Sequence, residues 1–82
     1  MRLDPATQTA RLRREKRAKG KVVTVVAGLD PAGNDLPELA SRLKTRCGVG
    51  GTVKDGLIEL QGDHLDSAEA ALRAFGYKTA RK

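Results

Sequence analysis

The chain has 82 residues, of which 32% are charged and 2% aromatic, and its formal net charge is +6 at pH 7. This length allows one domain with one small core. A single cysteine excludes an internal disulfide, and no apolar leader or long apolar run is present, so we expect a cytoplasmic protein that is neither secreted nor inserted in a membrane.

The positive charge is concentrated in the first quarter of the chain. Residues 1–21 carry eight basic and two acidic side chains, whereas residues 22–82 carry eight of each. This segregation predicts that the basic segment contacts a polyanion, with a solvated basic tail as the alternative. Because Phe75 and Tyr77 are the only aromatic residues, base stacking on exposed rings is disfavoured, and recognition of phosphates and of shape remains.

The N-terminal segment has the weakest pattern. Residues 1–10 lack periodicity and predict a disordered lead-in. Residues 10–16, ARLRREK, fit either an edge strand protected by charge or a frayed helix start, and intrinsic propensity favours the helix. Gly20 then allows a tight turn. Four basic side chains are expected to project from its tip: Lys16, Arg17, Lys19 and Lys21.

Residues 22–29 form a nearly continuous β-branched run, which is typical of a central strand covered on both faces. After a loop at 30–34, Asp35 and Glu38 predict a capping box, and Pro37 fits the first turn of a helix. Apolar residues recur on one face of this helix, which we expect to lie on the sheet: Leu36, Leu39, Ala40, Leu43 and Cys47.

The end of this helix carries outward-facing basic residues. Lys44 and Arg46, with Arg42 one turn earlier, are either favourable charges at a helix C-terminus, worth about 0.3–1 kcal/mol, or ligands of RNA phosphates. The glycine-rich residues 48–51 follow a helix and lack the GxxxxGK[ST] spacing. A helix cap and turn are therefore favoured over a phosphate cradle.

A hairpin is predicted next, because Asp55-Gly56 separates two β-prone runs and both turn positions of such a hairpin need positive φ. In the second run, Ile58 and Leu60 alternate with Leu57, Glu59 and Gln61, so one face is expected to be buried.

A second helix is expected after Asp63 and Asp66, which can stabilise its start, and it should stop at Gly76. Its buried face is predicted to hold Leu65, Ala68, Ala71, Leu72 and Phe75. Residues 77–81 then alternate as a short edge strand. His64 is the only histidine and lacks a nucleophile or metal-ligand cluster, so a surface position is favoured and neither a metal nor a cofactor is expected.

The predicted order is strand, strand, helix, strand, strand, helix, strand. This order indicates an α+β fold, a two-layer sandwich in which two helices pack on one face of a mixed four- to five-stranded sheet. The other face and the basic loop are then available to a partner.

Two motifs carry a family resemblance. Gly51-Thr52-Val53-Lys54, followed by IELQGD at residues 58–63, resembles the signature of eukaryotic translation initiation factor one and its bacterial and archaeal relatives, including the YciH-type proteins. The similarity extends back through residues 21–29 and 43–47, so the family domain is expected to span residues 11–82, after a lead-in at 1–10. The resemblance favours a strand over a helix before the basic loop.

The resemblance also implies RNA-binding sites at the basic loop (Lys16, Arg17, Lys19, Lys21) and at the helix end (Arg42, Lys44, Arg46). The sequence departs from the family at Gly20, where an Arg is common, and at Thr45, which interrupts a lysine-rich run.

The function that the resemblance implies is that of a non-enzymatic, monomeric translation initiation factor. It would bind the rRNA of the small ribosomal subunit near the P site and modulate start-codon and initiator-tRNA selection, with initiator tRNA and other initiation factors as further partners. Two alternatives stay open: a conditional inhibitor of initiation that uses the same surface, and a general RNA- or DNA-binding module. An enzyme is least favoured, because no acid–base or nucleophile arrangement emerges from the chain.

Overall fold

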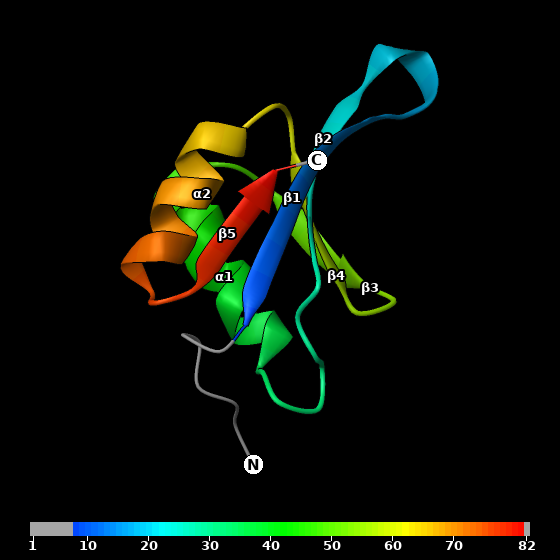
Figure 1. Cartoon of the computed structure of the whole chain (residues 1–82). Helices are drawn as coiled ribbons and strands as arrows, with labels where there is room; N and C mark the ends of the chain where they lie inside the picture. Colours follow the sequence, from blue (N-terminus) through cyan, green and yellow to red (C-terminus); the bar gives the residue numbers. More distant parts are fainter. Residues whose placement is uncertain (1–7, 82) are drawn as a thin grey trace.

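The computed structural model describes residues 8–81, and its elements follow the predicted order (Figure 1). One mixed sheet is formed by β1 (Thr9–Lys16), β2 (Val22–Ala27), β3 (Gly51–Lys54), β4 (Leu57–Gln61) and β5 (Lys78–Arg81). The helices α1 (Leu36–Cys47) and α2 (Leu65–Ala74) cover one face of it, which confirms the α+β two-layer prediction. Residues 1–7 of the expected lead-in lie outside the described residues, whereas Thr9 and Ala10 already belong to β1.

The strand order is β3-β4-β2-β1-β5. β2 is therefore central, as predicted, and pairs antiparallel with both β1 and β4. The strand that the resemblance favours for residues 10–16 is confirmed, and the frayed helix start is wrong. The expected edge position is also wrong, because β1 lies between β2 and β5. The C-terminal β5 pairs parallel with it from Thr9↔Lys78 to Leu12↔Arg81 and takes the edge position.

Local sequence accounts for the ends of α1. The Asp35 carboxylate accepts a hydrogen bond from the Glu38 amide at 3.1 Å, and Pro37 lies in the first turn, as predicted. At the other end Gly48 has φ +68°, and its N–H donates to the carbonyl of Lys44 at 2.8 Å. The glycine-rich residues 48–51 thus provide a helix cap and turn, as predicted from their position directly after a helix.

The β3–β4 hairpin has the predicted turn. Asp55 and Gly56 have φ of +52° and +77°, and Lys54 pairs with Leu57 across the turn. Ile58 and Leu60 are buried beneath the helices, so the alternation in this strand was interpreted correctly.

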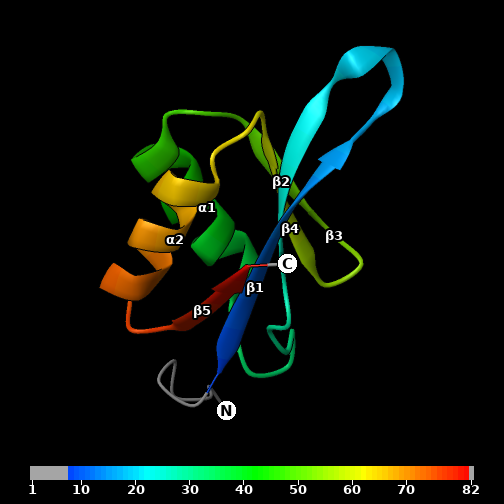
Figure 2. The same cartoon turned by 45° about the horizontal axis from the view of Figure 1, so that its top comes forward.

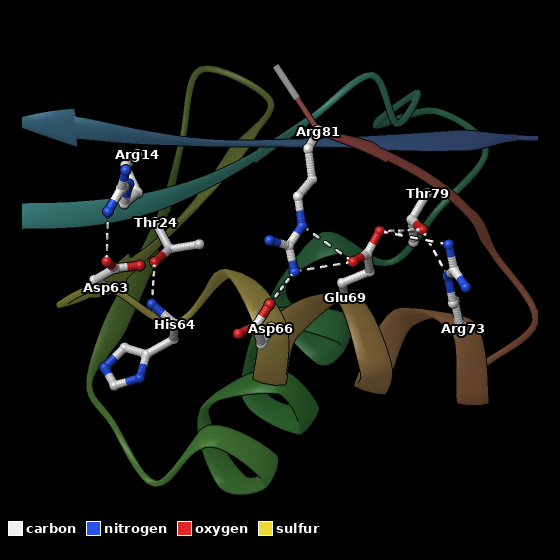
Figure 3. Close-up of polar contacts among 9 residues, drawn as sticks. All are labelled: Arg14, Thr24, Asp63, His64, Asp66, Glu69, Arg73, Thr79 and Arg81. Carbon is white, nitrogen blue, oxygen red and sulfur yellow. Dashed lines mark hydrogen bonds and ion pairs between the residues drawn. The ribbon is translucent and has the colours of Figure 1, made fainter.

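A buried threonine connects β2 to the start of α2. The Thr24 side chain is fully buried, and its hydroxyl donates to the carbonyl of Gly62 at 2.7 Å and accepts from the His64 amide at 2.8 Å. His64 is the N-cap residue of α2 and is half-buried, and its backbone amide helps to fix the start of this helix. Figure 3 shows this contact beside the Arg14–Asp63 ion pair.

The core lies between the sheet and the two helices. Its largest fully buried side chains include Leu12 of β1, Leu43 of α1 and Leu72 of α2. Phe75, predicted on the buried face of α2, follows the last helical residue and is only partly buried. Neither helix in residues 8–81 combines the length and the apolar character needed to cross a membrane.

Candidate nucleic-acid interface

The β1–β2 hairpin projects beyond the rest of the sheet (Figures 1 and 2). β1 pairs with β2 as far as Lys16↔Val22, and the last contact of β2 with the end of β4 is the Gly62 amide, which donates to the carbonyl of Val22 at 2.8 Å. The loop end of the hairpin therefore extends beyond β4. The Arg17 amide donates to the carbonyl of Lys21 at 2.6 Å and closes the loop. Its tip is a short 3₁₀ turn, Ala18–Gly20. All residues from 16 to 21 are exposed, so the hairpin tip is a surface offered to solvent.

Backbone geometry fixes the shape of this tip. Lys19 has φ +62° and ψ +31°, and Gly20 follows with φ +73°. Two consecutive left-handed residues turn the chain sharply, and this conformation is uncommon for a lysine. The glycine at position 20, a departure from the family pattern, is therefore suited to the turn that the chain makes here.

Three lysines supply the charge of the tip. Lys16, Lys19 and Lys21 are exposed. Across residues 8–81, none of the three forms an ion pair. Their ammonium groups are free to neutralise the phosphates of a nucleic acid.

Arg17 was expected to project from the tip, but its guanidinium group contacts two carboxylates. Its Nη2 atom lies 2.8 Å from Oε1 of Glu15 and 2.9 Å from Oε2 of Glu59 in β4. Arg13 completes the group, with Nε 2.6 Å from Oε2 of Glu15. The hydrogen bond from Arg13, together with the charges of Arg13 and Arg17, holds the pKa of Glu15 below its usual value. These four side chains form an ion-pair network on the sheet face that lacks helices.

The network covers apolar surface. Val25 of β2 is fully buried although it points away from the helical layer, and its cross-strand neighbours are Arg13 and Glu59. The central strand is thus covered on both faces, as predicted, but the second cover consists of long charged side chains.

The end of α1 forms the second basic group. The guanidinium carbons of Arg42 and Arg46 lie 4.2 and 5.6 Å from the ring centroid of Phe75. Both arginines are exposed and Lys44 is half-buried, in agreement with the predicted outward face. Phe75 holds the two guanidinium groups together and leaves their outer sides free for anions.

The last turn of α1 and the base of the hairpin lie on the same side of the domain, one in each layer. The last turn of α1 is followed closely by β3, which starts at Gly51, and the Gln61 amide at the end of β4 donates to the carbonyl of Gly50 at 2.9 Å. Figure 2 shows the end of α1 and the β1–β2 hairpin on the upper side of the domain.

Other charged side chains are used within the fold. Glu69 of α2 accepts hydrogen bonds from Thr79 at 2.8 Å and from Arg81 at 3.1 Å, and Arg81 also pairs with Asp66 (Figure 3). The Thr79 hydrogen bond is the largest cause of a lowered pKa at Glu69, and the bond to Asp66 raises the pKa of Arg81. These contacts attach β5 to α2.

No group of three or more His, Cys, Asp and Glu residues within 8–81 could hold a metal ion. Cys47 is half-buried, and burial raises the pKa of its thiol, which favours the unreactive protonated form.

The described part of the chain is a small α+β domain with two exposed basic groups.

Comparison with known proteins gives the family. The family described as translation initiation factor SUI1 matches residues 6–78. A protein translation factor SUI1 homolog from Picrophilus torridus is 46% identical over 76 residues, which are 92% of this chain and 77% of that protein. Homologs from Sulfurisphaera tokodaii (43% over 75 residues, 92% of this chain and 75% of that protein) and Methanopyrus kandleri (58% over 53 residues, 65% and 50%) are also similar. The chain belongs to the translation initiation factor SUI1 family, which confirms the resemblance noted from its motifs.

Proposed function

We propose that this protein is a translation initiation factor that binds the small ribosomal subunit near the P site and modulates start-codon and initiator-tRNA selection. It acts as a monomer in the cytoplasm, where its partners are rRNA, initiator tRNA and other initiation factors, and it makes or breaks no covalent bond. Family membership supports the role in initiation. The projecting hairpin, whose three lysines form no ion pair within residues 8–81, is the observation that best supports docking on RNA.

Charge and shape explain how such a protein would dock. Lys16, Lys19 and Lys21 would enter a concave RNA surface as one group, while Arg42, Lys44 and Arg46 contact phosphates at the end of α1. Each neutralised phosphate releases condensed counterions, so binding should weaken steeply as salt rises. Since Phe75 is covered by the two arginines, recognition would rest on phosphates and RNA shape and not on base stacking.

Modulation of initiation requires a difference in affinity between states. A factor changes an equilibrium only as far as it binds one conformation better than the other. We infer that the hairpin fits one conformation of the small subunit and fits another less well. Start-codon selection would then depend on the occupancy of that site.

The test is equilibrium binding of labelled protein to purified small subunits across a salt series, with large subunits and an unrelated RNA duplex as competitors. Saturation at one copy per small subunit with poor competition supports the proposal. Equal competition by any polyanion contradicts it and leaves a general RNA- or DNA-binding module. An initiation assay with matched and mismatched start codons then separates a fidelity factor from a conditional inhibitor, because only the former changes the ratio of the two products.

A further inference from the structure

The basic residues of the hairpin fall into two groups according to what they contact. Lys16, Lys19 and Lys21 have no ion-pair partner among the described residues. Arg17, in contrast, lies within 2.9 Å of two carboxylates, those of Glu15 and Glu59. The two groups therefore differ in what they can offer to a phosphate.

We propose that Glu59 holds the lysine hairpin in its docking direction through Arg17, which makes Arg17 a positioning residue and not a phosphate ligand. This inference rests on the proposed function, since it concerns how the same hairpin is oriented for binding to the small subunit. It adds a role for a carboxylate of β4, where charge alone suggests that an acidic residue would oppose RNA binding.

Glu59 is well placed as an anchor. It lies in β4 and pairs with Val25 of β2 on one side and Thr52 of β3 on the other, and its side chain is only 17% exposed. Arg17 stands at the base of the hairpin loop, where its amide also bonds the carbonyl of Lys21. The ion pair therefore joins the loop to a strand outside the hairpin.

The hairpin needs such a contact because it leaves the sheet. β4 accompanies β2 to Val23↔Gln61, and the Gly62 amide just after β4 still donates to the carbonyl of Val22 at 2.8 Å. Beyond this contact only the end of the β1–β2 hairpin, from Lys16↔Val22 through its loop, continues (Figure 1). Two-stranded ribbons twist more than wider sheets and are only marginally stable alone. A contact from Arg17 to β4 limits the directions that the ribbon can take.

Local charge also argues against Arg17 as a phosphate ligand. Arg13 and Arg17 face Glu15 and Glu59, so two positive and two negative groups offset one another. A phosphate that approached Arg17 would have to displace one carboxylate and remain close to the other. The guanidinium group, with its several donors, is suited to bridge two carboxylates in this way.

The first test is Glu59→Gln, which keeps the size of the side chain and removes its charge. Loss of a negative charge by itself strengthens binding to a polyanion, whereas loss of a positioning contact weakens it. We expect affinity for small subunits to fall by about threefold or more, and exchange of the Arg17 amide hydrogen to accelerate by about tenfold in the free protein. Unchanged or tighter binding, or unchanged exchange, would overturn the proposal.

Glu69→Gln is the matched control. It also removes one carboxylate from an arginine network, but at the contact between α2 and β5. We expect its affinity for the small subunit to equal or slightly exceed that of the wild type, with hairpin exchange unchanged. A loss of affinity equal to that of Glu59→Gln would overturn the proposal, because the effect would then be one of general stability.

The second test exchanges the two charges. Arg17→Glu alone should weaken binding about tenfold, and Arg17→Glu combined with Glu59→Arg should restore affinity to within about threefold of wild type. A double variant as weak as Arg17→Glu would show that Arg17 contacts phosphate directly. If wild-type protein fails to bind small subunits selectively, the proposed function is wrong, while amide exchange in the free protein still decides whether Glu59 orders the hairpin.

Discussion

At the scale of single residues, the hydroxyl of Thr24 holds the chain where it leaves β4 for α2. It donates to the Gly62 carbonyl and accepts from the His64 amide, and the side chain has no exposed surface. Two backbone groups would lose a partner if this hydroxyl were absent. The site therefore shows how one buried polar group can define the entry to a helix.

Thr24→Val keeps the shape of the side chain and removes both hydrogen bonds. We expect it to lower the free energy of unfolding by about 1–3 kcal/mol, because the buried backbone groups become unsatisfied. Urea unfolding measures the loss, and faster hydrogen exchange at the His64 amide locates it. Thr52→Val, the same change at an exposed position of β3, is the control and should stay within about 0.5 kcal/mol of wild type. Equal stability of the two variants would contradict this role of Thr24.

At the scale of elements, apolar side chains of the sheet are covered by helices on one face and by long charged side chains on the other. Leu43 of α1 packs in the core between the layers, where it is fully buried. Val25 of β2 is equally buried on the opposite face, beneath Arg13 and Glu59. Long charged side chains can move aside more easily than a packed helix.

Truncation at these two positions should therefore differ in cost. We expect Leu43→Ala to destabilise the domain by about 2–4 kcal/mol, since it leaves a cavity in a close-packed interior. Val25→Ala removes fewer carbon atoms from beneath a flexible cover and should cost less. Chemical denaturation measures both variants. A negligible effect of Leu43→Ala, or a larger one for Val25→Ala, would contradict the assignment of the core to the helical side.

The end of α1 should contribute to binding more than to stability. We expect Lys44→Ala combined with Arg46→Ala to weaken binding to small subunits by about tenfold, because two phosphate contacts are lost. The free energy of unfolding should fall by only about 0.3–1 kcal/mol, the worth of basic charge at a helix C-terminus. Arg73→Ala with Lys78→Ala is the control for net charge and should bind nearly as wild type. Unfolding of the first variant would instead indicate a structural position.

At the scale of the whole molecule, arginines and lysines are used differently. The ion pairs within residues 8–81 all involve arginine, for example Arg14 with Asp63 at 2.8 Å and Arg73 with Glu69 at 3.6 Å. The lysines in that range form none, which leaves their charge to the surface. A planar guanidinium group is suited to fixed pairing with carboxylates, and an ammonium group on a flexible stem is suited to phosphates.

These pairs make stability depend on pH in a defined direction. Hydrogen bonds from Arg13 to Glu15, Arg14 to Asp63 and Thr79 to Glu69 are the largest causes that hold the pKa of each carboxyl below its usual value. A group with a lowered folded-state pKa stabilises the fold above its unfolded pKa, and this stabilisation is lost as pH falls through the folded value.

We therefore expect the urea midpoint of unfolding to be level above about pH 5 and to decline below about pH 4, the range in which unfolded Asp and Glu take up protons. Glu69→Gln should make the decline shallower, because it removes one of the three titrating groups. A midpoint that rises on acidification would contradict the assignment.

Local sequence predicted those features that depend on neighbouring residues. The Asp55-Gly56 turn, the Asp35 cap and the burial of Ile58 and Leu60 all follow from short-range patterns, and the structure confirms them. The interior position of β1 was missed, because its second partner, β5, comes from the other end of the chain.

The candidate site could be predicted only in part, because some of its contacts join residues that are far apart in the sequence. The exposure of the hairpin lysines follows from their place in a polar turn. Glu59 was correctly placed on the face away from the helices, but no short-range signal shows that Arg17, 42 residues earlier, reaches it. The contact of Arg42 and Arg46 with Phe75 likewise joins the ends of two helices that meet only in the folded chain. Such contacts are set by the packing of the layers.

Docking through the hairpin is tested by comparing two variants that remove equal charge. Lys19→Gln with Lys21→Gln alters the hairpin, and Lys54→Gln with Lys78→Gln alters the two edges of the sheet. Binding to purified small subunits is measured for both across a salt series. We expect the hairpin variant to bind more weakly and the magnitude of its slope of log affinity against log salt to decrease by about 1–2. The slope of the edge variant should change little. Identical slopes and affinities for the two variants would contradict docking through the hairpin.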